Sequence, residues 1–174
     1  MAEFGRGAKA GVVAGLIIGA LAAIIGTALA MTIFYDETIG VAMQAIEESG
    51  APMDMNDLRN MVLGFMVIGS IIGAVITALF GAIFGLIYAW LYGRLPGITP
   101  IAKGVVVGLG WWIVGTIFGI VLTMAISSIM GPMAQEQMTI ATSSTMMAID
   151  TIIDLATKIL YGYLLGRFWI RFGE

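Results

Sequence analysis

The chain has 174 residues, of which 60% are hydrophobic and only 11% are charged, and its net charge is −3 at pH 7. A water-soluble domain of this length cannot bury so much apolar surface, because soluble domains are about one quarter charged. The sequence contains no Cys and no His, which excludes disulfides, Fe–S clusters and thiolate or imidazole metal sites, and the negative net charge disfavours a nucleic-acid partner.

Four apolar stretches are long enough to cross the hydrocarbon core of a bilayer, which takes about 20 helical residues. They cover approximately residues 10–34, 61–92, 104–129 and 149–170. We therefore expect an all-α integral membrane protein with four transmembrane helices, arranged as two tandem helical hairpins at residues 1–94 and 104–174. An acidic outer loop at 35–60 joins the first two helices, and a linker at 95–103 joins the hairpins. Within the acidic loop, a short helix is predicted from Asp36, as its N-cap, to Glu48.

Basic residues predict how these helices are oriented in the membrane. Arg59 lies alone among the basic residues in the acidic loop, and Lys158 lies inside the fourth stretch. The other six flank the opposite ends of the helices, namely Arg6, Lys9, Arg94, Lys103, Arg167 and Arg171. Because Lys and Arg are enriched on the cytoplasmic side, we expect a multi-pass protein of the cell membrane with both termini and the linker in the cytoplasm.

The two hairpins resemble each other in sequence. A shift of 93 residues lays residues 11–33 on 104–126 with 10 of 23 positions identical. A shift of 73 residues lays Tyr88, Leu91, Gly93 and Arg94 on Tyr161, Leu164, Gly166 and Arg167. These matches predict a duplicated unit whose two copies insert the same way up.

Two outer segments, Ala51-Pro52-Met53 and Gly131-Pro132-Met133, also match. Proline is favoured in the first turn of a helix, where its missing N–H costs nothing. The second helix of each hairpin is therefore predicted to begin at its proline and to extend beyond the outer face of the membrane. In the second hairpin, residues 135–145 would form the projecting part.

Glycines recur at intervals of four residues along the first three apolar stretches. Residues four apart share one helix face, and small residues let two backbones approach closely, which favours helix association in lipid. These rows predict tight packing within the bundle or between subunits, with a glycine-lined hinge or pore as the alternative. The candidate packing residues are Gly7, Gly11, Gly15, Gly19, Gly69, Gly73, Gly81, Gly85, Gly104, Gly108, Gly115 and Gly119.

Three ionisable residues, Asp150, Asp154 and Lys158, lie four residues apart inside the fourth stretch. Each charge at the centre of a bilayer costs about 2.5–3.5 kcal/mol. We expect Asp154 and Lys158 to form an ion pair, because an acid one turn before a base is the favourable order on a helix. Alternatively, Lys158 extends toward the cytoplasm on its long side chain. Such a pair either fixes helix register and docks another subunit, or takes part in the movement of an ion or a proton.

Methionines and aromatic residues are concentrated near the predicted membrane surfaces. Thioethers can bind Cu(I), and Met53 and Met55 form a candidate pair in the outer loop, with adaptable packing as the alternative. Most of the aromatic residues at the cytoplasmic ends of the helices are predicted to form an interfacial belt, namely Tyr88, Trp90, Tyr92, Tyr161, Tyr163 and Trp169. Trp111 and Trp112 are expected to pack inside the bundle.

No phosphate-binding glycine loop or nucleophile elbow occurs in the sequence, so we expect neither an enzyme nor a bound cofactor. The leading hypothesis is a non-catalytic structural or accessory subunit, or a self-assembling scaffold, of a membrane complex. Its partners would be the lipid bilayer and either further copies of the chain or other membrane subunits. The alternatives are a small channel or carrier that uses Asp154 and Lys158, and an outward-facing Cu(I)-binding protein.

Overall fold

The computed structural model describes residues 2–33, 35–49, 54–140 and 144–173, and the side chains of 2, 37, 38, 41, 45, 47–49, 126, 127 and 129–146 fall outside the description. Within these ranges the chain forms α-helices and no strand, as predicted. In chain order the helices are α1 (Ala2–Thr32), α2 (Tyr35–Ser49), α3 (Met55–Leu91), α4 (Pro100–Ile140) and α5 (Ser144–Arg171).

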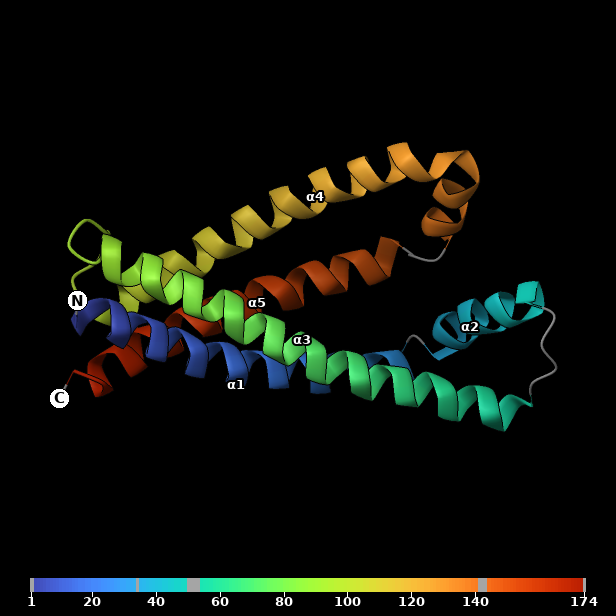
Figure 1. The fold of residues 1–174 in the computed structure, drawn as a ribbon, viewed down its shortest axis with the longest axis horizontal. Coiled ribbons are helices and arrows are strands. Elements are labelled where there is room, and N and C mark those ends of the chain that lie inside the picture. The colour runs from blue at the N-terminus through green and yellow to red at the C-terminus, as the bar shows by residue number, and fades with distance from the viewer. Residues whose placement is uncertain (1, 34, 50–53, 141–143, 174) are drawn as a thin grey trace.

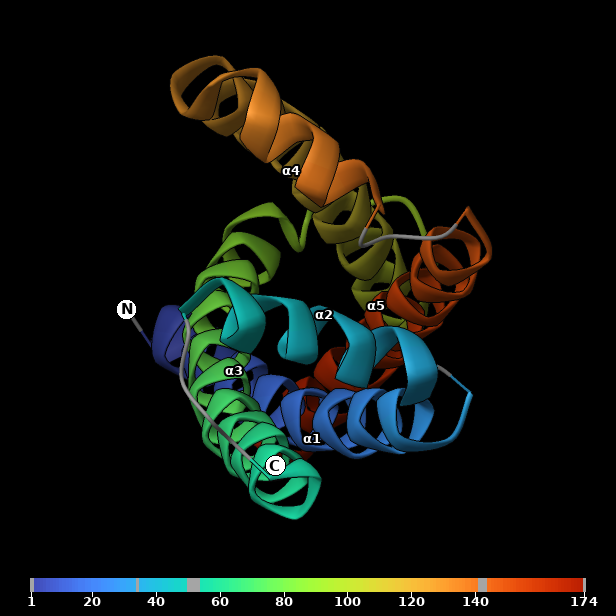
Figure 2. The same cartoon turned by 90° about the vertical axis from the view of Figure 1, so that its right-hand side faces the viewer.

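The four long helices form two antiparallel pairs. α1 lies along α3, α4 lies along α5, and the pairs meet chiefly where α1 contacts α5 (Figure 1). All four helices converge at the end of the molecule that holds both termini, which we call the terminal end. Toward the opposite, outer end α4 diverges from α5, and α2 lies across this end of the bundle (Figure 2).

Among the described residues, three helices are long and apolar enough to cross a membrane, at Glu3–Thr32, Met55–Leu91 and Pro100–Ala125. They correspond to the first three predicted stretches, and they support a membrane-embedded protein. α5 has 28 residues and is therefore long enough, but its charges at Asp150, Asp154 and Lys158 place it outside this class. The fourth membrane span stays a prediction.

The second pair of helices departs from the prediction at Pro132. α4 continues through this residue to Ile140, and α5 begins only at Ser144, so a helix start at Pro132 is wrong. With 41 residues against 28, α4 rather than α5 is the longer helix of this pair. Inside a helix, a proline removes one hydrogen bond and clashes with the preceding turn, which kinks the helix. Figure 1 shows such a bend in the orange, C-terminal part of α4. Residues 135–140 therefore end α4, and 141–143 lie outside the described residues.

The predicted short helix is present at the outer end of the first pair, but the residues at the helix starts differ from the prediction. α2 begins at Tyr35, so Asp36 lies in its first turn and is not its N-cap. Asp54 caps α3 instead, and its carboxylate accepts a hydrogen bond of 2.8 Å from the backbone N–H of Met55, which satisfies one free donor of the first turn. The predicted start at Pro52 lies outside the described residues.

The connection between the pairs covers residues 92–99, because α3 ends at Leu91 and α4 begins at Pro100, so it begins and ends earlier in the chain than the predicted linker at 95–103. Gly97 has a φ of 123°, a conformation that only glycine adopts easily, and it turns the chain from α3 into α4. Thr99 then caps α4, since its hydroxyl accepts a hydrogen bond of 3.2 Å from the Ala102 N–H.

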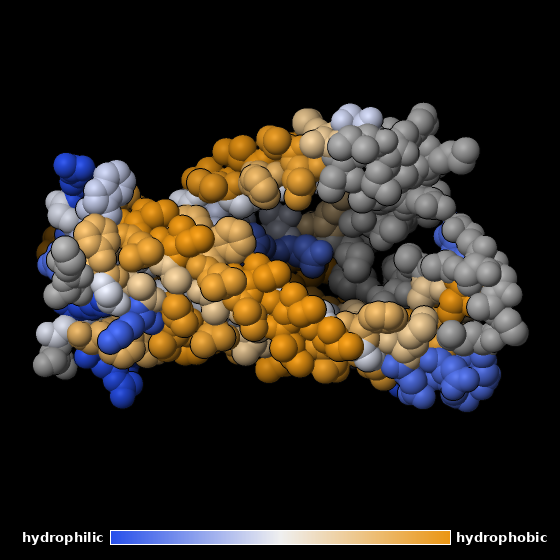
Figure 3. Space-filling model, viewed as in Figure 1, coloured by the Kyte–Doolittle hydropathy of each residue, from blue (hydrophilic) through white to orange (hydrophobic). Residues whose placement is uncertain are grey.

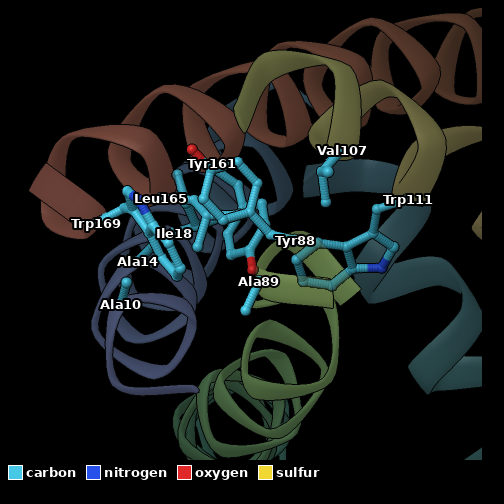
Figure 4. Packing of buried hydrophobic residues seen from close by; sticks show 10 residues of the cluster. All are labelled: Ala10, Ala14, Ile18, Tyr88, Ala89, Val107, Trp111, Tyr161, Leu165 and Trp169. Carbon is cyan, nitrogen blue, oxygen red and sulfur yellow. The ribbon is translucent and has the colours of Figure 1, made fainter. Parts of the chain in front are cut away.

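The buried core lies toward the terminal end and draws on all four long helices (Figure 4). Its aromatic rings interlock, with Trp111 stacked on Phe84 at 4.8 Å between ring centres and edge-on to Tyr161 at 4.6 Å. Smaller side chains of α1 fill the remaining space. The core residues are Ala10, Ala14, Ile18, Tyr88, Ala89, Val107, Trp111, Tyr161, Leu165 and Trp169.

This core corrects the prediction of an interfacial belt for Tyr88, Tyr161 and Trp169, all of which are buried. The two tyrosines can be buried because their hydroxyls have partners inside the protein. Tyr88 donates to the carbonyl oxygen of Pro100, and Tyr161 donates to that of Gly81, each at 2.7 Å.

Candidate functional site

α1 and α3 touch through their backbones at positions where side chains are absent or small. A Cβ atom on Gly11 would lie 2.8 Å from the carbonyl carbon of Gly81, closer than real Cβ contacts come. Such close approach brings backbone atoms into dispersion contact and is possible only without side chains. Along this seam the contacts pair Gly7 with Gly85, Gly11 with Gly81, Gly15 with Thr77 and Gly19 with Ala74.

α4 and α5 meet in the same way, but only near the terminal end. Gly104 lies against Gly162, and Gly108 lies against the backbone of Lys158. A Cβ atom on Gly166 would lie 2.5 Å from the Cα of Ile101. Sequence reasoning missed Gly162 and Gly166, although they continue the four-residue row that starts at Asp150.

Four of the candidate packing glycines have no neighbour in the structure. A Cβ atom on Gly69, Gly73, Gly115 or Gly119 would meet nothing within 4 Å. Gly69 and Gly73 lie near the middle of α3, and Gly115 and Gly119 lie near the middle of α4, beyond its last close contact with α5 at Gly108. Gly69 and Gly73 line a groove between α1 and α3, with a volume of about 370 Å³, whose other walls include Gly19.

Asp154 and Lys158 form an ion pair on α5. Lys158 Nζ lies 2.7 Å from Asp154 Oδ1 and 4.8 Å from the centre of the Trp111 ring. A cation over a tryptophan face is attracted by the ring quadrupole, so two partners hold the ammonium. Because Asp154 precedes Lys158 on α5, the ammonium points toward the outer end and does not extend toward the terminal end. The Lys158 side chain is 16% exposed, whereas that of Asp154 is 48% exposed.

The two carboxylates face the interior of the bundle. Residues eleven positions apart are separated by about three full turns and lie on the same side of a helix. Asp150 therefore shares a side with Tyr161, and Asp154 with Leu165, and both of these partners are 0% exposed. The opposite side of α5 carries exposed apolar residues, including Ile152, which is 68% exposed.

α3 turns its unpartnered glycines toward the same interior. Gly73 lies eleven residues before Phe84, whose ring stacks on Trp111 of α4, so this side of α3 faces α4. Figure 3 shows a hollow beneath the outer part of α4, with hydrophilic atoms on its floor. The core closes the bundle at the terminal end. The carboxylates of α5 therefore lie on the side of the helix that faces the region between the outer parts of α3, α4 and α5, which we call the interior space, and α2 lies across the outer end of the bundle (Figure 2).

Comparison with protein-family models, with curated proteins and with solved structures gives no match. The geometry and chemistry of these residues are therefore the basis for a functional proposal.

The copper hypothesis gains no support from the described residues. Met53 lies outside them, and Met55 is 50% exposed at the start of α3. In the described part of the chain, no three acidic side chains gather in a way that could hold a metal ion.

The terminal end is tied together by two cations that lie on aromatic rings. Arg6 lies 4.4 Å from the centre of the Trp169 ring and donates from Nε to the Trp169 carbonyl oxygen at 2.5 Å. Lys103 lies 4.3 Å from the centre of the Tyr92 ring and donates to the Tyr92 carbonyl oxygen at 2.7 Å. The two rings stack on each other at 5.1 Å. This stack joins α1, α3, α4 and α5 at one level.

Proposed function

We propose that the chain is a non-catalytic subunit of a membrane complex, and that its interior space receives a transmembrane helix from a second copy or from another subunit. In this proposal the protein lies in the cell membrane, with four spans and both termini in the cytoplasm. The grouping of six basic residues near the terminal end supports this orientation.

The two helix pairs support a tandem duplication because glycines spaced by four residues bring the two backbones of each pair together. In the first pair, residues 7, 11 and 15 meet residues 85, 81 and 77, and in the second pair, residues 100, 104 and 108 meet 166, 162 and 158. A shift of 93 residues therefore aligns α1 with α4, as in the sequence match. A shift of 81 residues aligns α3 with α5, which is about two helical turns more than the 73-residue shift of the sequence match. In this register Gly69, Gly73 and Thr77 correspond to Asp150, Asp154 and Lys158.

The observation that carries the assembly proposal is the exposure of the middle of α4, where Gly115 and Gly119 lie. Every residue from 113 to 123 is exposed, and a Cβ atom on Gly115 or Gly119 would meet nothing within 4 Å. Across the interior, Asp150 and Asp154 cannot face acyl chains without a cost of about 2.5–3.5 kcal/mol for each charge at mid-membrane. A helix packed into this space would bury the glycines and shield the carboxylates from lipid.

The mass of the assembly, measured in a gentle detergent, tests this proposal. The variant Gly115→Leu with Gly119→Leu fills the unpartnered face of α4. Gly110→Leu is the matched control, because Gly110 also has nothing within 4 Å and lies on the opposite side of α4 from Gly119. We expect the wild type and the control to exceed the mass of one chain and the double variant to lose its partner. A wild type of single-chain mass would refute the proposal.

A small channel or carrier is the second candidate, favoured by the half-exposed carboxylate of Asp154 in the open interior. In a channel or carrier, water would fill the interior space that a transmembrane helix occupies in the first proposal. Because the chain contains no Cys, a single introduced thiol can be labelled without background. We expect Asp154→Cys, but not the lipid-facing Ile152→Cys, to react with a membrane-impermeant maleimide if water fills the interior. In reconstituted vesicles, Asp154→Asn with Lys158→Met should then abolish cation flux, and a wild type without flux would exclude this candidate.

A further inference from the structure

The surfaces of α3 and α5 that face away from the core each carry a row of apolar side chains leading to an aromatic residue and then to an arginine. On α3 the row ends with Trp90, which is 63% exposed, followed one turn later by Arg94. On α5 it ends with Tyr163, which is 37% exposed, followed one turn later by Arg167. The apolar members are Leu79, Ile83 and Leu86 on α3 and Ile152, Ile159 and Leu160 on α5, and all are exposed.

The aromatic residue orients the arginine on α5. Arg167 Nη1 donates a hydrogen bond of 3.2 Å to the hydroxyl oxygen of Tyr163. A guanidinium has five N–H donors, so four are left for a ligand at the surface. Within the part of the chain that the structure describes, the one ion pair joins Lys158 to Asp154. No described carboxylate therefore neutralises Arg94 or Arg167.

We propose that these two rows bind anionic phospholipids in the leaflet at the terminal end. The acyl chains would lie along the apolar row, the aromatic ring at the level of the ester groups, and the guanidinium against the phosphate, whose oxygens accept two parallel N–H bonds. An anionic lipid fits better than a zwitterionic one, because a zwitterionic headgroup carries its own cation beside the phosphate.

The apolar rows favour a lipid over free phosphate as the ligand. Free phosphate would gain nothing from Leu86 and Trp90, or from Leu160 and Tyr163, whereas a phospholipid contacts the whole row. This inference needs only that the chain lies in a bilayer, and it does not depend on assembly with another subunit.

Native mass spectrometry of the full chain, stripped of lipid in detergent, tests the inference. Phosphatidylglycerol and phosphatidylcholine are titrated separately, and the dissociation constants are compared. We expect phosphatidylglycerol to bind more tightly. In Arg94→Gln with Arg167→Gln, its affinity at each site should fall about fivefold, the usual effect of one basic residue near an anionic surface. Arg59→Gln, at the other end of α3 and also exposed, should bind like the wild type.

The conservative variant Arg94→Lys with Arg167→Lys keeps the charge and separates a lost site from a misfolded chain. It should retain the preference for phosphatidylglycerol with a smaller loss of affinity, because lysine lacks the planar fork. Equal binding of the two lipids by the wild type, or an equal loss in Arg59→Gln, would overturn the inference. Full displacement of phosphatidylglycerol by an equimolar amount of inorganic phosphate would show a free-anion site and overturn the assignment to lipid.

Discussion

Replacing Gly11 by alanine tests the closest contact between α1 and α3. The new methyl carbon would lie 2.8 Å from the carbonyl carbon of Gly81, whereas real Cβ atoms essentially never come within 3.0 Å of another atom. The obstructing atoms belong to a helix backbone and cannot rotate away. The two helices must therefore separate locally by about 0.5–1 Å, which removes a quarter to a half of the dispersion energy of each affected contact.

The expected cost follows from two opposing effects. Overpacking of a tight contact costs about 1–3 kcal/mol, and alanine recovers up to about 1 kcal/mol over glycine through its higher helix propensity. We expect Gly11→Ala to lower the free energy of unfolding by about 1–2 kcal/mol. Gly26→Ala on the same helix is the control, because a Cβ atom there meets nothing within 4 Å and only the gain in propensity applies.

Reversible unfolding in mixed micelles, with sodium dodecyl sulfate as the denaturant and circular dichroism as the signal, measures both variants. We expect Gly11→Ala to unfold at a lower fraction of dodecyl sulfate than the wild type, and we expect no such decrease for Gly26→Ala. If the two variants were equally stable, α1 and α3 would not meet at this seam.

The same assay checks three further predictions. Tyr161→Phe should lower stability by about 1 kcal/mol, because it removes the buried hydrogen bond from α5 to the Gly81 carbonyl; an unchanged midpoint would argue against that contact. Lys158→Met should destabilise the protein more than Lys158→Met combined with Asp154→Asn. The single variant leaves an unpaired carboxylate, which costs about 2.5–3.5 kcal/mol at mid-membrane. Equal losses of stability in the two variants would mean that water already solvates the Asp154 carboxylate. Trp111→Ala should cost about 3–5 kcal/mol, since its ring contacts α3 and α5 within the core, and a loss below 1 kcal/mol would contradict the packing of α4.

The helical class and most helix positions could be predicted from the sequence, because both follow from local patterns. The apolar stretches have the length of membrane helices, and the polar segment from Asp36 to Glu48 between the first two stretches is long enough for a short helix. The prediction for Pro132 is wrong because proline fits both the first turn of a helix and a kink within one. Tertiary contacts with other parts of the chain, and not the local sequence, decide which of these two roles a proline takes.

The partners of each side chain could not be predicted, because a membrane helix has few signals that distinguish its faces. The glycine rows indicate close packing. However, nothing in the sequence of the row from Gly69 to Gly85 shows that Gly81 and Gly85 contact another helix whereas Gly69 and Gly73 do not. For Tyr88, the sequence predicts a place at the membrane interface, because tyrosine is common there. Its burial depends on the carbonyl of Pro100, which is brought into reach only by the turn between the two helix pairs.

The contact between Arg6 and Trp169 bears on the order in which the protein can form during its synthesis. The two residues are 163 positions apart, so the ribosome must make almost the whole chain before the arginine meets its ring. Until then, the surface of α1 that α5 will cover has to be sheltered by lipid or by the insertion machinery. The α1–α3 seam, whose members are all present once α3 has emerged, is suited to hold the first half of the protein together during this interval.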